Sequence, residues 1–261
     1  MSANPDIIRN DGQQRNKHSL FRSANPALTS KTFTNMPKLT GEVMTVGGAA
    51  NKVFISLVIL LLFGYLTFSL EITALTFIGF IGGFLVAILT VFKKNLSPVT
   101  VPIYAALEGL ALGGISFIFN ELYDGIVSQA VFLTLAILFS LLLAYKSKLI
   151  KPSENFKLGV VAATGGIFIV YVFSFIMSFF GSGMSILNPN NTSMLSIGFS
   201  LFIVVIASLN LVLDFDFIEE GADRGAPKYM EWYGAFGLLV TLIWLYLEIL
   251  RLLAKLYSRR S

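Results

Sequence analysis

Cysteine is absent from the 261-residue chain, and histidine occurs only once, at His18. The lack of cysteine excludes disulfide bonds, iron–sulfur clusters, thiolate metal sites and a cysteine nucleophile. A single histidine excludes zinc sites built from paired histidines. Glycine-rich nucleotide loops and the common hydrolase motifs are also missing. We therefore expect no cofactor and no enzymatic activity.

Charged residues are scarce as well. They make up 13% of the chain, whereas 55% is hydrophobic and the mean hydropathy is +0.76. Soluble domains are nearer a quarter charged, so this composition indicates an integral membrane protein surrounded by the lipid bilayer. The net charge of +4 does not point to nucleic acid, because the basic residues lie between the apolar runs, where they orient helices.

Apolar runs of membrane-spanning length recur through most of the chain. A helix needs about 20 apolar residues to cross the roughly 30 Å of hydrocarbon in a bilayer. Seven such runs occur, at about residues 53–70, 72–92, 99–119, 128–145, 158–180, 194–217 and 229–256. The sequence thus predicts an all-α fold with seven transmembrane helices.

The N-terminal residues have a different composition. Residues 1–50 are polar, and they carry the basic residues Arg9, Arg15, Lys17, Arg22, Lys31 and Lys38. Too little apolar surface is present to offset the entropy of ordering, so we predict a disordered basic cytoplasmic arm. No apolar core lies near Met1, which argues against a signal peptide. Residues 51–261 form the predicted transmembrane domain.

Basic residues also predict the orientation in the membrane. They occupy alternate loops, at Lys93, Lys94, Lys146, Lys148, Lys151, Lys157, Arg224 and Lys228, while the opposite loops contain no Lys or Arg. The positive-inside rule then predicts a multi-pass protein of the cell membrane with a cytoplasmic N-terminus. Seven crossings place the tail residues Lys255, Arg259 and Arg260 outside, which the rule disfavours, so a re-entrant last segment is an alternative.

Four acidic residues within or near the ends of the apolar runs are candidate functional groups. They are Glu108, Asp214, Asp216 and Glu248. A charge at the centre of a membrane helix costs about 2.5–3.5 kcal/mol on insertion scales, so each one needs a reason. Asp214 and Asp216 are separated by about 200° around a helix, and only one of them can face the bundle. Asn210 aligns with Asp214, and we assign that pair to the inward face.

Asp216 forms a second acidic stripe with Glu219 and Glu220 at the predicted cytoplasmic mouth. Their oxygen atoms suit the transient binding of calcium or another divalent cation. An alternative is that this stripe is only a solvated helix end. An alternative role for Glu248 is to pair with Arg251, three residues further along the same helix. Glu108 and the glycines that follow it, Gly109, Gly113 and Gly114, are equally compatible with helix packing.

Three stretches resemble a known family. They are residues 108–113 in the third run, 213–218 at the end of the sixth and 245–253 in the last. Together with the seven apolar runs, they resemble the Bax inhibitor family, in a bacterial-type branch with a long N-terminal arm. The resemblance extends over about residues 45–256 and implies a seven-helix bundle with the last helix central.

The resemblance also implies a pH-sensitive calcium leak. In characterised relatives, an acidic residue on the sixth helix and another on the last one form a hydrogen-bonded pair that closes the path. Asp214 matches the first. Alignment on Arg251 places Thr241 where the second is usually Asp, and Glu248, two turns further along the same face, is its candidate replacement.

Two hypotheses for the function follow. The first is a calcium or cation leak with Asp214, Glu248, Asp216 and Glu108 in its pathway and pH gate. Two carboxyl groups close together in a low-dielectric medium share a proton readily, which couples helix position to pH. The alternative is a non-transporting regulator that binds a membrane protease or other membrane proteins. The basic arm favours the regulator, because a simple pore needs no such extension.

Overall fold

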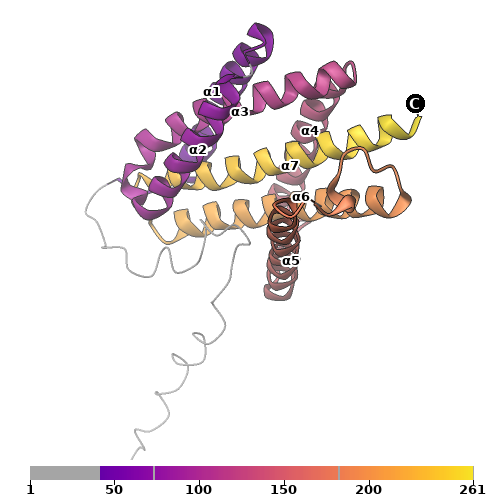
Figure 1. Ribbon diagram of the computed structural model, residues 1–261. Coiled ribbons are helices and arrows are strands. Elements are labelled where there is room, and N and C mark those ends of the chain that lie inside the picture. The colour runs from indigo at the N-terminus through magenta and orange to yellow at the C-terminus, as the bar shows by residue number, and fades with distance from the viewer. Residues whose placement is uncertain (1–41, 73, 182, 261) are drawn as a thin grey trace, which may run out of the picture.

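The computed structural model describes residues 42–72, 74–181 and 183–260 (Figure 1). Within these residues the chain forms seven α-helices and two short 3₁₀ turns, with no strand. The helices are α1 Val46–Leu70, α2 Ala74–Phe92, α3 Ser97–Leu122, α4 Ile126–Lys146, α5 Glu154–Ser178, α6 Met194–Asp223 and α7 Met230–Arg260. The 3₁₀ turns are η2 Lys94–Leu96 and η3 Ser185–Leu187. The predicted all-α bundle is confirmed.

All seven helices of the described residues are long and apolar enough to cross a membrane. The shortest, α2, has 19 residues and therefore reaches about 28 Å, close to the thickness of the hydrocarbon core. The chain is a multi-pass membrane protein.

Helix α1 begins earlier than the sequence predicted. Residues 46–50, assigned above to the arm, are helical. The reason is a local cap: Thr45 Oγ1 accepts a hydrogen bond from the backbone N–H of Gly48 at 2.9 Å. The carboxylate of Glu231 on α7 also accepts hydrogen bonds from the N–H and Oγ1 of Thr45, both at 3.0 Å. Residues 1–41 of the predicted arm lie outside the described residues.

Helix α7 occupies the centre of the bundle, as predicted. It runs beside α6 in the opposite direction and also contacts α1, α3 and α4 (Figure 1). Of the most apolar stretch of α7, 67% is buried inside the protein. This is the largest buried share among the seven spans of the described residues. Helix α5, in contrast, packs mainly on α6 and has the smallest buried share.

The C-terminal end of α7 lies at the opposite end of the bundle from the α6–α7 turn. Lys255 there is fully buried, and its Nζ donates to the carbonyl oxygens of Ile186 and Ser196 at 2.7 and 3.2 Å and to Ser200 Oγ at 2.8 Å. These partners belong to η3 and the first turns of α6. Helix α7 therefore runs unbroken from the α6–α7 turn to the opposite end of the bundle, where Lys255 is packed against η3 and α6.

Glycines bring α1, α2 and α3 into close contact. A Cβ atom at Gly109 would lie 2.5 Å from the carbonyl oxygen of Leu60, and one at Gly113 would overlap the carbonyl oxygen of Gly64. On the other side of α3, Gly79 of α2 lies against the backbone of Leu107. Small residues allow such close approach of membrane helices. The contacts therefore support a role of these glycines in helix packing.

Substituting Gly109 with Ala is expected to destabilise the bundle by about 1–3 kcal/mol, because the added methyl group must push α1 away from α3. Unfolding of the detergent-solubilised protein measures the change. Gly165→Ala on α5 is the matched control, since nothing lies within 4 Å of a Cβ atom there. Equal stability of the two variants would contradict close packing at Gly109.

Candidate functional site

A line of polar side chains runs between α5, α6 and α7 through an otherwise apolar bundle. We call it the polar seam. Its members from α5 are Lys157, Thr164 and Tyr171, those from α6 are Asn210, Asp214 and Asp216, and those from α7 are Thr241, Glu248 and Arg251. Helices α6 and α7 run in opposite directions. Along the seam in one direction, the residue numbers therefore fall on α6 and rise on α7.

Helix α5 contributes one polar residue every seven positions, which places all three on one face. Lys157 Nζ lies 2.7 Å from Asp216 Oδ2. Further along, Asn210 Nδ2 donates to Thr164 Oγ1 at 2.9 Å. The third contact is the Tyr171 hydroxyl, which donates to Glu248 Oε1 at 2.5 Å. These three contacts attach α5 to the central helix pair.

Asp214 differs from the other acidic residues of the seam. Its side chain is fully buried, and neither carboxyl oxygen has a partner at hydrogen-bonding distance and angle among the described residues. The hydroxyl of Thr241 on α7 lies beside the carboxyl group. A carboxyl group at this depth without a compensating bond is costly. Asp214 therefore lies on the inward face with Asn210, as the sequence predicted.

Glu248 lies apart from Asp214. Its buried carboxylate receives hydrogen bonds from Arg251 Nη1, at 2.8 and 2.9 Å, and from Tyr171. Arg251 also donates to the Tyr171 hydroxyl at 2.8 Å. Glu248 follows Thr241 by two helical turns, or about 10 Å along α7. The structure brings Asp214 to Thr241, whereas it places Glu248 in the ion pair with Arg251 that was the alternative interpretation.

The acidic stripe at the end of α6 does not converge on one point. Asp216 pairs with Lys157, Glu219 accepts a hydrogen bond from the Tyr145 hydroxyl, and Glu220 pairs with Arg224. Among the described residues no group of three acidic or histidine side chains is arranged to hold a metal ion. The predicted divalent site at Asp216, Glu219 and Glu220 thus gains no geometric support.

Glu108 lies outside the polar seam. Its carboxylate faces α2, where a Cβ atom at Gly83 would be 2.7 Å from Glu108 Oε1, and the hydroxyl of Tyr104 lies beside it. These contacts match the packing alternative for Glu108.

Sequence reasoning missed the contribution of α5. The sequence predicts Lys157 to be a loop charge and assigns no role to Thr164 and Tyr171. The available signal was the spacing of seven between these polar residues in an apolar helix, which places them on one face. Polar side chains so placed in a membrane helix indicate contact with a neighbouring helix.

Comparison with known proteins gives one match. A family model described as Bax inhibitor 1 like matches residues 12–258, which is nearly the whole chain. Neither a curated protein nor a solved structure matches. That family comprises membrane channels and regulators and is not a known class of enzymes.

Proposed function

Because the chain belongs to the Bax inhibitor 1 like family, we propose that it is a pH-sensitive leak for calcium or another cation, with Asp214 as the group that senses pH. The observation that carries this proposal is the buried carboxyl group of Asp214, whose oxygens have no hydrogen-bond partner of good geometry in the part of the chain that the structure describes. An ionisable residue inside the membrane is by default a candidate functional site.

The polar seam supplies the route. It leads from the cluster around Glu248, past Asn210, to Asp214, while the Lys157–Asp216 pair lies on another side of α6. Polar side chains along this line replace part of the hydration shell that a cation loses in the bilayer. In this proposal the described arrangement is the closed state, because Asp214 has no exposed surface.

The family pattern is modified at the gate. Thr241, not a second carboxyl group, lies beside Asp214. A hydroxyl group can donate a hydrogen bond to an ionised carboxylate and can accept one from a protonated carboxyl group. Thr241 can therefore form a hydrogen bond with either protonation state of Asp214. We propose that gain and loss of a proton by Asp214 alone changes the contact between α6 and α7.

Calcium flux into liposomes that contain the purified protein tests the proposal. Flux should depend on the protein and should change with pH. Because α5 is attached to the seam by its polar contacts, flux should also respond to a disulfide engineered between α5 and α6 in this cysteine-free chain. Absence of flux at every pH would contradict the leak.

The regulatory function remains the second candidate, and the attachment of the arm favours it. The backbone N–H of Met44 donates to the carbonyl oxygen of Ala226 at 2.7 Å. The backbone N–H of Lys228 donates to the carbonyl oxygen of Glu42 at 3.1 Å. Glu42 and Met44 therefore lie at the α6–α7 turn. We propose that a membrane protein recognised by the basic segment that precedes them in the sequence binds at this end of the bundle.

Removing residues 1–40 separates the two functions. The deletion leaves the Thr45 cap and its bonds to Glu231 intact, so we expect the bundle to fold and cation flux to persist. Under the regulatory function, the truncated protein loses its effect in cells while liposome flux stays unchanged. Loss of flux on truncation would instead assign the arm to the leak.

A further inference from the structure

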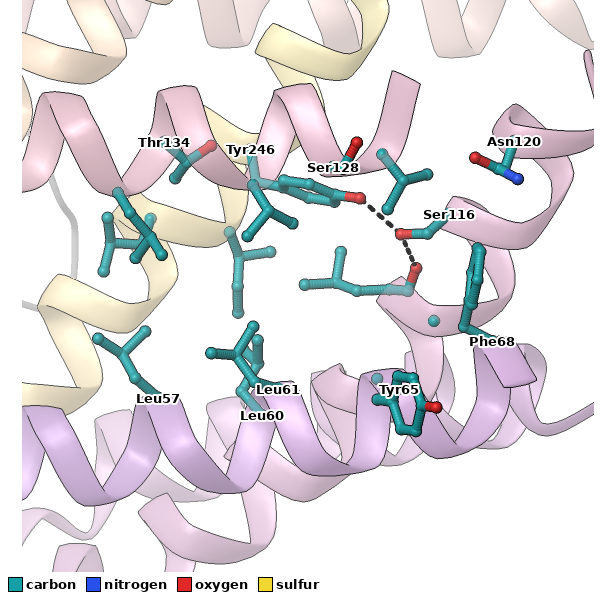
Figure 2. Close-up of a pocket in the computed structure, with 18 of the residues that line it drawn as sticks. Leu57, Leu60, Leu61, Tyr65, Phe68, Ser116, Asn120, Ser128, Thr134 and Tyr246 are labelled. Carbon is teal, nitrogen blue, oxygen red and sulfur yellow. Dashed lines mark hydrogen bonds between the residues drawn. The ribbon is translucent and has the colours of Figure 1, made fainter. Parts of the chain in front are cut away.

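A cavity of about 390 Å³ lies between α1, α3, α4 and α7 (Figure 2). This volume falls within the roughly 300–1,000 Å³ of small-molecule sites. Leu61 and Tyr65 of α1 line the cavity and are exposed on the surface of the bundle. The cavity therefore opens sideways, toward the lipid, and we call it the lateral groove.

The lateral groove is separate from the polar seam. On α7 it is lined by Leu239, Leu242, Ile243 and Tyr246. At about 100° per residue, Thr241 points about 100–160° away from these side chains. The groove and Asp214 thus lie on different faces of the central helix.

Polar groups gather at one end of the groove. The end near Leu57 is lined mainly by leucines, and the hydroxyl of Thr134 there donates to the carbonyl oxygen of Ala130. Ser116 and Asn120 lie at the other end (Figure 2), and Asp124 of the lining follows Asn120 at the same interval of four residues. The side chains of Asn120 and Asp124 form no hydrogen bond or ion pair within the described part of the chain. The groove therefore has the polarity of an amphiphile site, with unused polar groups at its mouth.

The length of the groove matches one leaflet of a bilayer. From Leu57 to Phe68 the lining residues of α1 span about 16 Å, and half of the hydrocarbon core is about 15 Å thick. The polar end lies at the α3–α4 turn, between the ends of two membrane-spanning helices, and we therefore expect it at the level of the lipid headgroups. One acyl chain can therefore lie along the groove while its headgroup reaches that turn.

The charge of the lining selects among headgroups. Asp124 is the acidic residue at the polar end, and no Lys, Arg or His of the described residues lines the groove. A headgroup that carries only negative charge meets no cation there, whereas an ammonium group can pair with Asp124. The amide N–H groups of Asn120 are free to donate to a phosphate.

We propose that the lateral groove binds a phospholipid with an ethanolamine-type headgroup from the leaflet at the α3–α4 turn. The acyl chain lies between α1 and α4, the ammonium group contacts Asp124 and the phosphate contacts Asn120. Loop charges predict that this is the outer leaflet.

The test uses the full-length protein in a non-ionic detergent. Its thermal unfolding midpoint is measured while lysophosphatidylethanolamine or lysophosphatidylglycerol with the same acyl chain is added. A ligand that binds the folded state raises the midpoint. We expect tighter binding of the ethanolamine lipid, and we expect Asp124→Asn to weaken it about fivefold, as for a partly exposed ion pair.

Two matched pairs of variants complete the test. Glu121→Gln changes an exposed acidic residue that does not line the groove, and it should leave binding unchanged. Leu61→Trp fills the groove and should abolish binding of both lipids, whereas Leu62→Trp, on the exposed side of the same helix, should not. Equal binding of the two lipids, or full binding by Asp124→Asn or Leu61→Trp, would overturn the proposal.

Discussion

Replacing Asp214 with Asn is expected to abolish the pH dependence of cation flux. Asn has nearly the same shape and can still contact the Thr241 hydroxyl, but it cannot gain or lose a proton. The proposed switch is then fixed in one state, and the ratio of the fluxes on the two sides of the transition should fall to about one. Liposome flux across a range of pH measures this ratio.

The variant should remain folded. Among the described residues Asp214 has no ion pair to lose, and the amide can keep the contact with Thr241, so exchanging the buried carboxyl group for a neutral amide removes a desolvation cost. Unfolding in detergent should show stability equal to or above that of the wild type. A folded Asp214→Asn protein with an unchanged pH profile would contradict the gate and favour the regulatory function.

Two further substitutions serve as controls for Asp214. Asp216→Asn breaks the contact with Lys157 and should lower stability, but it should leave the midpoint of the pH profile in place because Asp216 faces away from Asp214. Thr241→Asp adds a second carboxyl group beside Asp214 and should move that midpoint, since two neighbouring carboxyl groups titrate as a coupled pair.

Hydropathy predicted the spans well because in lipid every backbone polar group must be bonded within the helix. The start of α1 was missed for a tertiary reason. Thr45 caps this helix while bonded to Glu231, which follows it by 186 residues. Similarly, the helical angle placed Asp214 with Asn210 correctly, but it gave no information on the neighbouring helix that each residue contacts.

Glu248 shows which contacts can be predicted from spacing along one helix and which cannot. Its spacing to Arg251 predicted the ion pair correctly as an alternative. The hydroxyl that completes the cluster, from Tyr171, lies 77 residues away in the chain, and only the packing of α5 brings it near. The depth of the pair was also unknown from the sequence, and depth decides how much the pair contributes to stability.

Replacing Arg251 with Leu is expected to destabilise the protein by about 3–5 kcal/mol. The carboxylate of Glu248 is 2% exposed, so removal of its partner leaves a buried charge without compensation. An exposed helix pair would lose less than about 1 kcal/mol. The same change removes the Arg251–Tyr171 hydrogen bond, which weakens the attachment of α5.

A double-mutant cycle separates the pair from general damage to packing. Combining Arg251→Leu with Glu248→Gln removes the buried charge as well as its partner, so the double variant should be more stable than Arg251→Leu alone. Detergent unfolding of the four proteins gives the coupling free energy. If Arg251→Leu cost under about 1 kcal/mol, or if Glu248→Gln failed to restore stability, Glu248 would not depend on Arg251 for charge compensation.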